Sequence, residues 1–212
     1  MSGDALPADL QADPVGARSP DVYVDPMSEK SMRERMLAGE PYIADDPVLA
    51  EESQRAQGLA HRINTMDPND ASGRRALLEE LLGGFGEHSE VRPPLHCDYG
   101  YQTTIGARTF VNWGVTFLDV AAITIGDDVQ IGPNVQLLTA THPLEPQPRR
   151  DKWEAAEPIR IGDNVWLGGG VIVCPGVTIG ADTVVGAGSV VTRDLPAGVV
   201  AVGSPARVLR EL

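Results

Sequence analysis

The residue best placed to do chemistry is His142, in the segment Thr139-Ala140-Thr141-His142-Pro143-Leu144. It is the only one of the four histidines beyond residue 100, and it stands where a regular repeat stops and an irregular stretch begins. An imidazole titrates near pH 7, so a histidine beside such a loop can act as a general base toward a substrate hydroxyl. On its sequence position alone, a structural role is equally open.

The two cysteines offer no second kind of chemistry. Cys97 and Cys174 lie far apart and form no CxxC or other metal-ligand spacing, so neither a metal site nor a disulfide framework is expected. Cys174 is better explained as a packed thiol than as a reactive one. This cysteine usage fits a reducing compartment, and the N-terminus shows no signal peptide pattern, so we expect a cytoplasmic protein.

A six-residue repeat provides the frame that holds His142. From residue 105 an aliphatic or aromatic residue recurs at every sixth place and is often followed by Gly. The register shifts by two residues after Ile123, and the segment 143–160 interrupts the pattern. Neither a helical period of 3.6 nor a strand period of 2 explains this spacing, whereas a hexapeptide-repeat β-helix does. The expected inward positions are Ile105, Val111, Phe117, Ile123, Ile125, Ile131, Leu137, Ile161, Leu167, Val173, Ile179, Val185 and Val191.

The fold class is therefore expected to be mainly β, with a small N-terminal α-helical region. Asp46 is the expected N-cap of one helix, with Pro47 in its first turn, and Gly83 ends another. The chain divides into four expected segments: a disordered tail over 1–26, a helical region over 27–91, a β-helix over 92–196 with a loop excursion at 143–160, and a C-terminal cap over 197–212.

The charge of the chain restricts its partners. It holds 30 acidic and 17 basic residues, a formal net charge of −13. Nucleic acids and anionic membranes attract clusters of Lys and Arg, so neither is an expected partner. No run of 18 apolar residues is present to span a bilayer. An anionic cofactor would need a local basic pocket.

The flat outer faces of a triangular column predict an assembly. Apolar side chains on such faces would be covered if three columns packed around a threefold axis, which would also create clefts between subunits. The candidates for these outward positions are Val115, Val120, Leu138 and Ile172.

Residues 27–212 resemble the hexapeptide-repeat sugar O-acetyltransferases, the family of the maltose, galactoside and nodulation acetyltransferases, and favour the maltose type. The resemblance implies a left-handed β-helix, a handedness that the period itself does not show. It also implies a homotrimer that uses acetyl-CoA and requires no metal. The matching motifs are Met36-Leu37-Ala38-Gly39-Glu40-Pro41-Tyr42, Cys97-Asp98-Tyr99-Gly100-Tyr101, Ala140-Thr141-His142-Pro143-Leu144, the run 161–170 and Gly203-Ser204-Pro205-Ala206-Arg207-Val208.

The resemblance implies a role for each matching residue. His142 stands where the family has its general base, which deprotonates a sugar hydroxyl as it attacks the acetyl thioester directly. Asn112 and Asp98 match positions that hold the acceptor, and Asp119 lies beside a third. The N–H of Gly169 matches the group that bonds the thioester carbonyl. The other cofactor positions are Trp166 along the pantetheine, Ala187 and Thr192 along the arm, and Arg193, Arg207 and Arg210 near the nucleotide.

Simpler explanations exist for several of these residues. Without the resemblance, Asn112 and Asp98 suit turns, and Arg207 and Arg210 suit solvated surface. Two departures leave the acceptor open: Ile43-Ala44 replace a carboxylate of the relatives, and Val120 replaces an Asp of the galactoside enzymes.

Three other functions are alternatives on this scaffold. The chain could acetylate another hydroxylated molecule, such as an antibiotic or an amino acid, or be a non-catalytic scaffold. A γ-type carbonic anhydrase needs three histidines on the column, and residues 105–212 contain one. The sequence does not name the physiological acceptor.

Overall fold

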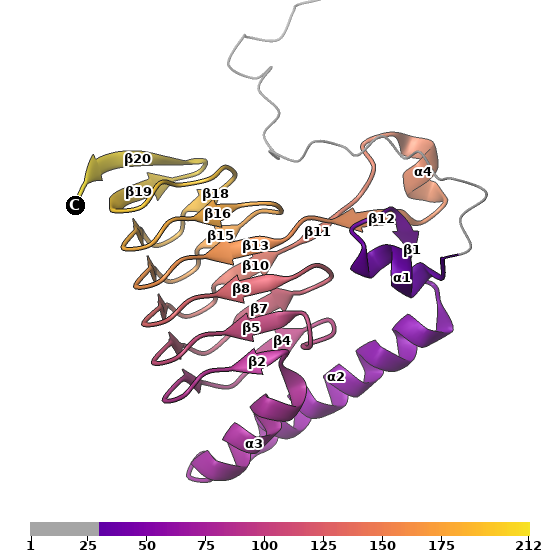
Figure 1. Cartoon of the computed structure of the whole chain (residues 1–212), viewed down its shortest axis with the longest axis horizontal. Coiled ribbons are helices and arrows are strands. Elements are labelled where there is room, and N and C mark those ends of the chain that lie inside the picture. Colours follow the sequence, from indigo (N-terminus) through magenta and orange to yellow (C-terminus); the bar gives the residue numbers. More distant parts are fainter. Residues whose placement is uncertain (1–29) are drawn as a thin grey trace, which may run out of the picture.

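A triangular column of stacked strands dominates the chain, in a computed structural model that describes residues 30–212 (Figure 1). The tail expected over 1–26 lies outside the described residues. The column has three sheets, each with strands from successive coils, and the expected left-handed parallel β-helix is confirmed.

Successive coils contribute one strand to each sheet. Sheet I contains, in spatial order, β16 (Thr178–Ile179), β13 (Ile159–Ile161), β8 (Ile123–Ile125), β5 (Thr103–Ile105) and β2 (Gly84–Phe85). Sheet II contains β20 (Ala206–Glu211), β19 (Val199–Gly203), β17 (Val184–Val185), β14 (Trp166–Leu167), β9 (Gln130–Ile131), β6 (Phe110–Val111) and β3 (Glu90–Val91). Sheet III contains β18 (Val190–Val191), β15 (Ile172–Val173), β10 (Gln136–Leu138), β7 (Val115–Leu118) and β4 (Leu95–Cys97). The pairings are parallel except between β19 and β20, where the chain folds back at its C-terminal end.

The column begins at Gly84, upstream of the expected residue 92. Phe85 and Val91 already occupy inward positions of the first coil, beneath Ile105 and Val111. Cys97 completes this coil in place of an aliphatic residue, beneath Phe117. Because Cys97 stands where later coils have an aliphatic residue, and Pro93-Pro94 stand at the corner in place of Gly, the repeat pattern does not reveal the first coil.

The coils near the N-terminus are two residues longer than the later ones. Thr104 pairs with Thr124, twenty residues on, whereas Arg160 pairs with Thr178, eighteen residues on. The extra residues lie at the corner where the chain passes from sheet III to sheet I, which explains the register shift in the repeat. This corner forms one wall of the cavity described below.

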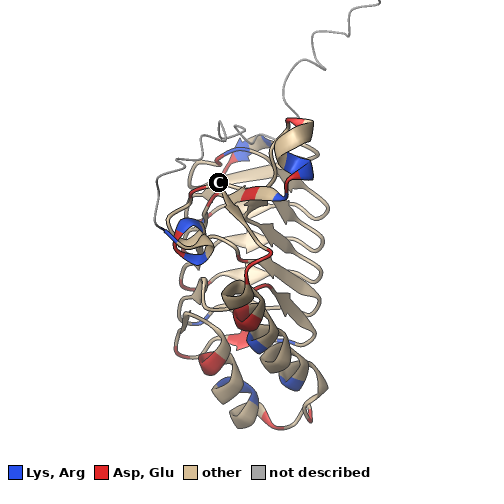
Figure 2. Ribbon diagram, turned by 90° about the vertical axis from the view of Figure 1, so that its right-hand side faces the viewer, with Lys and Arg blue, Asp and Glu red and all other residues tan. Residues whose placement is uncertain are grey.

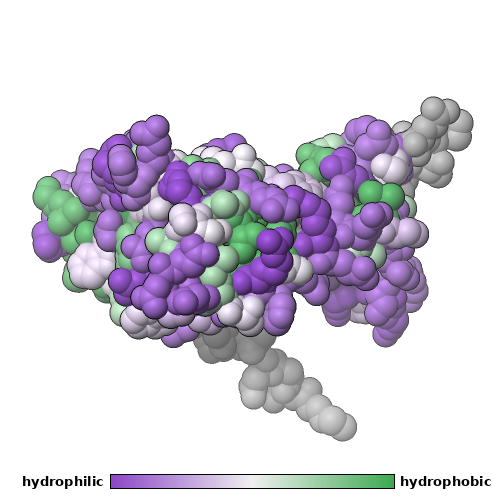
Figure 3. Space-filling model, turned by 90° about the horizontal axis from the view of Figure 1, so that it is seen from below, coloured by the Kyte–Doolittle hydropathy of each residue, from purple (hydrophilic) through white to green (hydrophobic). Residues whose placement is uncertain are grey.

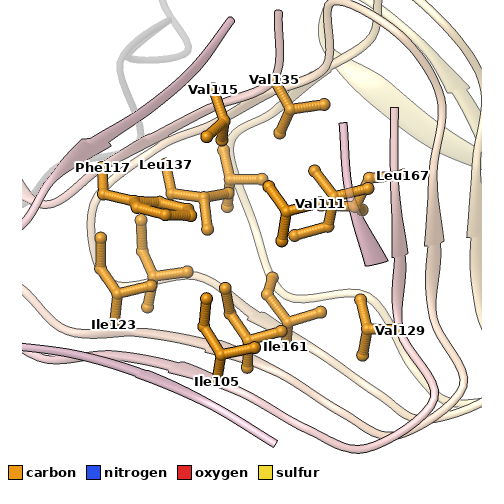
Figure 4. Close-up of a cluster of buried hydrophobic side chains, with 14 of the residues drawn as sticks. Ile105, Val111, Val115, Phe117, Ile123, Val129, Val135, Leu137, Ile161 and Leu167 are labelled. Atoms are coloured by element: carbon orange, nitrogen blue, oxygen red, sulfur yellow. The ribbon is translucent and has the colours of Figure 1, made fainter. Parts of the chain in front are cut away.

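The expected inward side chains fill the column in layers (Figure 4). All thirteen are buried, and they belong to one continuous core. The expectation that Val115 faces outward is wrong, because it is fully buried in that core. Val120 lies outside the column, but the chain's own Met36 and Tyr42 cover it.

Helices close the N-terminal end of the column. They are α2 (Pro47–Thr65) and α3 (Ala71–Leu81), whereas α1 (Met32–Leu37) lies beside the column and packs against Tyr42 and Val120. The start of α2 is confirmed, since the Asp46 side chain caps it by accepting from the N–H groups of Val48 and Leu49. Ile63 and Leu78 extend the column core into these helices, whose outer surface is mostly hydrophilic (Figure 3). No helix within 30–212 combines the length and apolarity that crossing a membrane requires.

The excursion after β10 returns to pair with the N-terminal arm, the segment before α2 that contains α1 and β1 (Tyr42–Ile43). It follows β11 (Ala140–Thr141) and contains α4 (Pro146–Arg150) and β12 (Trp153–Ala156). Strand β12 lies between β11 and β1, and both pairings are antiparallel. Charged residues gather on the helices and the excursion, whereas the stacked strands facing the viewer in Figure 2 contain few.

Candidate active site

His142 borders a cavity between the column, the N-terminal arm and the excursion. The cavity measures about 430 Å³. Its polar side chains include Asp98, Glu154 and Tyr42. The remaining lining residues are Ala44, Leu49, Ala50, Ser53, Tyr99, Leu118, Val120 and Ala140. The structure thus places His142 and Asp98 in the lining of one cavity.

A second cavity of about 540 Å³ adjoins the first and shares Ala44, His142 and Glu154 with it. Arg149 and Lys152 line it from the excursion. The Arg149 guanidinium donates to the carbonyls of Pro143 (2.8 Å) and Leu144 (2.9 Å), so it fixes the chain directly after His142. These two hydrogen bonds within the excursion stabilise the backbone next to the imidazole.

Glu154 supplies a negative charge beside the imidazole. Its Oε2 lies 3.8 Å from Nε2 of His142, which is too long for a hydrogen bond but close enough for attraction to a protonated ring. The Tyr42 hydroxyl donates to Glu154, and burial together with the Glu154 charge raises the pKa of Tyr42 well above its usual range. A chain of contacts therefore runs from the N-terminal arm to His142, whose side chain is 58% exposed.

Asp98 presents an unpaired carboxylate to the cavity. Burial, and then the charge of Glu154, raise the pKa of Asp98 to about 6. Its carboxylate accepts no hydrogen bond from the part of the chain that the structure describes. A partly buried carboxylate without donors is suited to accept hydrogen bonds from a hydroxylated ligand.

Asp119 does not line the cavity, contrary to the expectation that it contacts the acceptor. It is fully buried, and it accepts hydrogen bonds from the N–H groups of Asp98 (3.0 Å) and Tyr99 (2.9 Å) and from the Thr103 hydroxyl (3.0 Å). Burial raises its pKa to about 6. Asp119 therefore supports the backbone that carries Asp98.

Replacing Asp98 with asparagine is expected to raise the free energy of unfolding at pH 7 by about 1–2 kcal/mol, after discounting the shift for partial exposure. The raised pKa means that the folded protein holds this proton more tightly than the unfolded chain, so ionisation at higher pH costs stability that Asn does not lose. Urea titrations should show the gain shrinking as the pH falls from about 6 toward 4. The matched Asp119→Asn variant should gain less, although burial raises the pKa of Asp119 as well, because an amide nitrogen cannot accept the hydrogen bond that the Thr103 hydroxyl donates. A destabilised Asp98→Asn variant would contradict this account.

Asn112 and Gly169 lie at a different corner of the column, where the chain passes from sheet II to sheet III. His142 and Asp98 lie at the corner between sheets III and I, so a single chain does not bring His142 and Asp98 together with Asn112 and Gly169. Asn112 is half-buried, and its Oδ1 accepts from the Trp113 N–H. The N–H groups of Gly169 and Ala187 donate to no backbone carbonyl within residues 30–212. They stack at this corner, since Gly188 N donates to Gly169 O.

The remaining expected cofactor residues are spread over the C-terminal half of the column. Trp166 is 56% exposed on the outer side of sheet II. Arg207 and Arg210 lie on β20, where each guanidinium donates to a nearby main-chain carbonyl. Thr192 and Arg193 lie at the corner between sheets III and I, two coils beyond His142. One chain thus does not gather these groups around a common centre.

Glu154 and Tyr42 are the site residues that the sequence analysis missed. They pair across 112 positions, from Tyr42 to Glu154 in the register of β1 and β12. Both lie outside the hexapeptide repeat, so its periodicity could not place them. The alternation of Trp153 and Glu154 in the excursion gives only a weak strand signal.

A hexapeptide-repeat β-helix whose exposed histidine borders an open cavity defines a class of protein, the hexapeptide acyltransferases. Two family models match the chain: the maltose acetyltransferase hexapeptide capping motif over residues 35–86, and the bacterial transferase hexapeptide over residues 158–193. The chain belongs to the family of maltose, galactoside and nodulation acetyltransferases, and it is an acetyltransferase of the hexapeptide type.

Relatives and solved structures agree with this assignment. Nodulation protein L of Rhizobium meliloti is 48% identical over 84% of this chain and 98% of its own length. A maltose O-acetyltransferase from Clostridium difficile is 43% identical, with a TM-score of 0.86 over 87% of this chain and 99% of that one. A galactoside acetyltransferase in complex with coenzyme A is 40% identical, with a TM-score of 0.83 over 86% of this chain and 91% of that one.

The described residues hold no group of three or more His, Cys, Asp or Glu side chains arranged for a metal ion.

Proposed function

We propose that the protein transfers the acetyl group of acetyl-CoA to a hydroxyl of a sugar, with His142 as the general base. The observation that carries this proposal is the cavity in which an exposed imidazole and the unpaired Asp98 carboxylate face the same space. A sugar hydroxyl needs both a base for its proton and an acceptor for a neighbouring hydroxyl. Membership of an acetyltransferase family supports the acyl donor.

The chemistry follows from the placement of His142. A hydroxyl is a weak nucleophile, and the imidazole takes its proton as the oxygen attacks the thioester carbonyl. The resulting imidazolium is stabilised by Glu154, 3.8 Å away. As the tetrahedral intermediate collapses, the C–S bond breaks, and the imidazolium can return its proton to the leaving thiolate. The Gly169 N–H is our candidate donor to the oxyanion.

The separation of the two corners supports an assembly. His142 and Asp98 lie at one corner, whereas Asn112, Gly169 and Ala187 lie at another. A complete site would form where the first corner of one subunit meets the second corner of its neighbour, as in a cyclic trimer. The N–H groups of Gly169 and Ala187 would hold the pantetheine arm against Trp166 of the same subunit, and Thr192 would contact it from the corner of the neighbouring subunit that carries His142. Arg193, Arg207 and Arg210 would then meet the phosphates of coenzyme A.

A free-thiol release assay tests this function. Acetyl-CoA is supplied with glucose, maltose, a galactoside, chloramphenicol or serine, and the released coenzyme A is measured. We expect release with the sugars and little with the other two acceptors. Release only with chloramphenicol or serine would replace the sugar with another hydroxylated acceptor. If the protein neither releases coenzyme A with any acceptor nor binds it, a non-catalytic scaffold would be favoured.

The two free cysteines fit the cytoplasm as the site of action.

Replacing Glu154 with glutamine is expected to lower kcat about 10-fold, because the imidazolium loses its nearby charge. The KM for acetyl-CoA should stay near the wild-type value. The matched control is Tyr42→Phe, which keeps the Glu154 charge and removes one hydrogen bond to it, so its loss should be smaller, about 2- to 3-fold. Steady-state kinetics of both variants decide the point. Equal losses would assign Glu154 a merely structural role.

A further inference from the structure

Lys152 lines the second cavity, beside His142, from a disfavoured backbone conformation. It connects α4 to β12 with a φ of 69°, in the left-handed region that residues with side chains rarely adopt. The six other residues besides glycine that the structure describes in this region turn corners of the column, where the coil requires it. Backbone strain outside such corners is typical of ligand sites. The position of Lys152 is therefore a candidate for binding.

The Lys152 ammonium is free to bind a ligand. It forms no hydrogen bond and no ion pair with any other residue of 30–212. Asp45 and Glu154 line the same cavity, yet neither carboxylate pairs with it. Glu154 instead accepts a hydrogen bond from the Tyr42 hydroxyl. The excursion thus presents a positive charge without a partner to a cavity that also contains the imidazole.

Arg149 adds a second positive charge to this wall of the cavity. Its Nη1 donates to the carbonyls of Pro143 and Leu144, which uses both hydrogens of that nitrogen. The N–H groups of Nε and Nη2 donate to no other group in the part of the chain that the structure describes. Both cations belong to the basic run Arg149-Arg150-Asp151-Lys152, in a chain whose net charge is −13.

The two cavities beside His142 offer different partners to a ligand. The first contains the carboxylates of Asp98 and Glu154 and no Lys or Arg, whereas the second contains Arg149 and Lys152. Both cavities share His142, so a ligand with one hydroxyl at the imidazole can extend into both. Its other hydroxyls can donate to Asp98 in the first cavity, while a group in the second meets charged donors.

We propose that Lys152 and Arg149 bind an anionic group of the acceptor, and that the preferred acceptor is an acidic sugar. The inference rests on the proposed function and names its substrate class. A neutral sugar provides no opposite charge for the ammonium or the guanidinium, whereas a phosphate or a carboxylate accepts charge-assisted hydrogen bonds from both. The carboxylates of Asp45 and Glu154 repel such a group, which confines it to the excursion side of the second cavity.

The test compares neutral and acidic acceptors with the same ring. Wild type is assayed by thiol release with glucose, glucose 1-phosphate, glucose 6-phosphate and glucuronate at saturating acetyl-CoA. The two phosphates leave every ring hydroxyl free in at least one of them, and glucuronate distinguishes a carboxylate from a phosphate. We expect kcat/KM for at least one acidic sugar to exceed that for glucose by about 10-fold. Added salt should lower this preference, because it screens exposed charges.

Variants of Lys152 separate charge from structure. Lys152→Gln should lose about 10-fold in kcat/KM for the preferred acidic sugar, mainly through KM, and about 2-fold or less for glucose. Lys152→Arg should keep part of the preference. Lys152→Gly suits the left-handed backbone, so it should unfold at or above the wild-type temperature and still lose the preference. Arg150→Gln is the matched control: it removes an equal charge from the same run, but its side chain lines neither cavity, so the preference should persist.

Three results would overturn the inference. They are a wild type that does not favour any of the acidic sugars over glucose, equal losses on acidic and neutral sugars in Lys152→Gln, and an equal loss of preference in Arg150→Gln. Transfer to no sugar by wild type would instead sink the proposed function. Calorimetry then tests the inference separately: an acidic sugar should bind wild type about 10-fold more tightly than Lys152→Gln, and equal affinities would overturn it.

Discussion

Replacing His142 with alanine is expected to lower kcat for acetyl transfer by at least about 100-fold, the usual contribution of a general base. Without the imidazole, the attacking hydroxyl must lose its proton to water while it attacks. The groups that bind both substrates are untouched, so both KM values should change little. This pattern would show that the lost interaction forms mainly in the transition state.

The His142→Ala variant should fold normally, because its side chain is more than half exposed and contributes little packing. Thermal unfolding should therefore match wild type. His61→Ala is a matched control, since His61 is an exposed histidine on α2 that lines neither cavity, and its loss should leave kcat unchanged. Turnover near the wild-type rate in His142→Ala would remove the imidazole from its proposed role.

The core of the column could be predicted from the sequence because each coil repeats the same requirement. Ile125, Ile161 and Ile179 stack in one sheet, and any polar residue there would lose its hydration without gaining a partner. A constraint repeated at a fixed interval leaves a period that can be read along the chain. The outward positions carry no such constraint, and Val115 shows the consequence: its type alone did not reveal the face on which it lies.

The cavity could be predicted only in part, because it forms where the repeat fails. Its wall is the corner with two additional residues in each early coil, which places Asp98 and Tyr99 outside the column. Its other wall depends on β1 pairing with β12, a contact between segments more than a hundred residues apart. Local patterns carry no information about such a pairing. The resemblance located His142 and Asp98 but not Glu154.

Asp119 shows a limit of reasoning from neighbouring positions. Its carboxylate lies one residue from a position matched to acceptor binding, yet its side chain points to the opposite side, into the protein. Side chains of adjacent residues in extended chain face opposite ways. The resulting buried carboxylate contributes to the site indirectly, through the Asp98 and Tyr99 backbone.

Two inactive variants are expected to restore activity when they assemble together. Ala187→Trp should block the proposed cofactor corner, because Ala187 is exposed and a bulky ring there leaves the column intact while it fills the space of the pantetheine arm. His142→Ala removes the base from the other corner. If a site takes one corner from each of two subunits, a mixed assembly contains some sites that carry neither change.

The recovery has a definite size. A cyclic trimer that contains both variants has one site of three that joins an intact base to an intact cofactor corner, whichever variant is in excess, so about a third of wild-type activity should return. Co-expression with different affinity tags, followed by two-step purification and the thiol release assay, measures it. The separately purified variants, mixed without unfolding, serve as the control. If co-assembled protein stays as inactive as its parents, base and cofactor corner belong to one chain, and the opposed corners of the column would need another explanation.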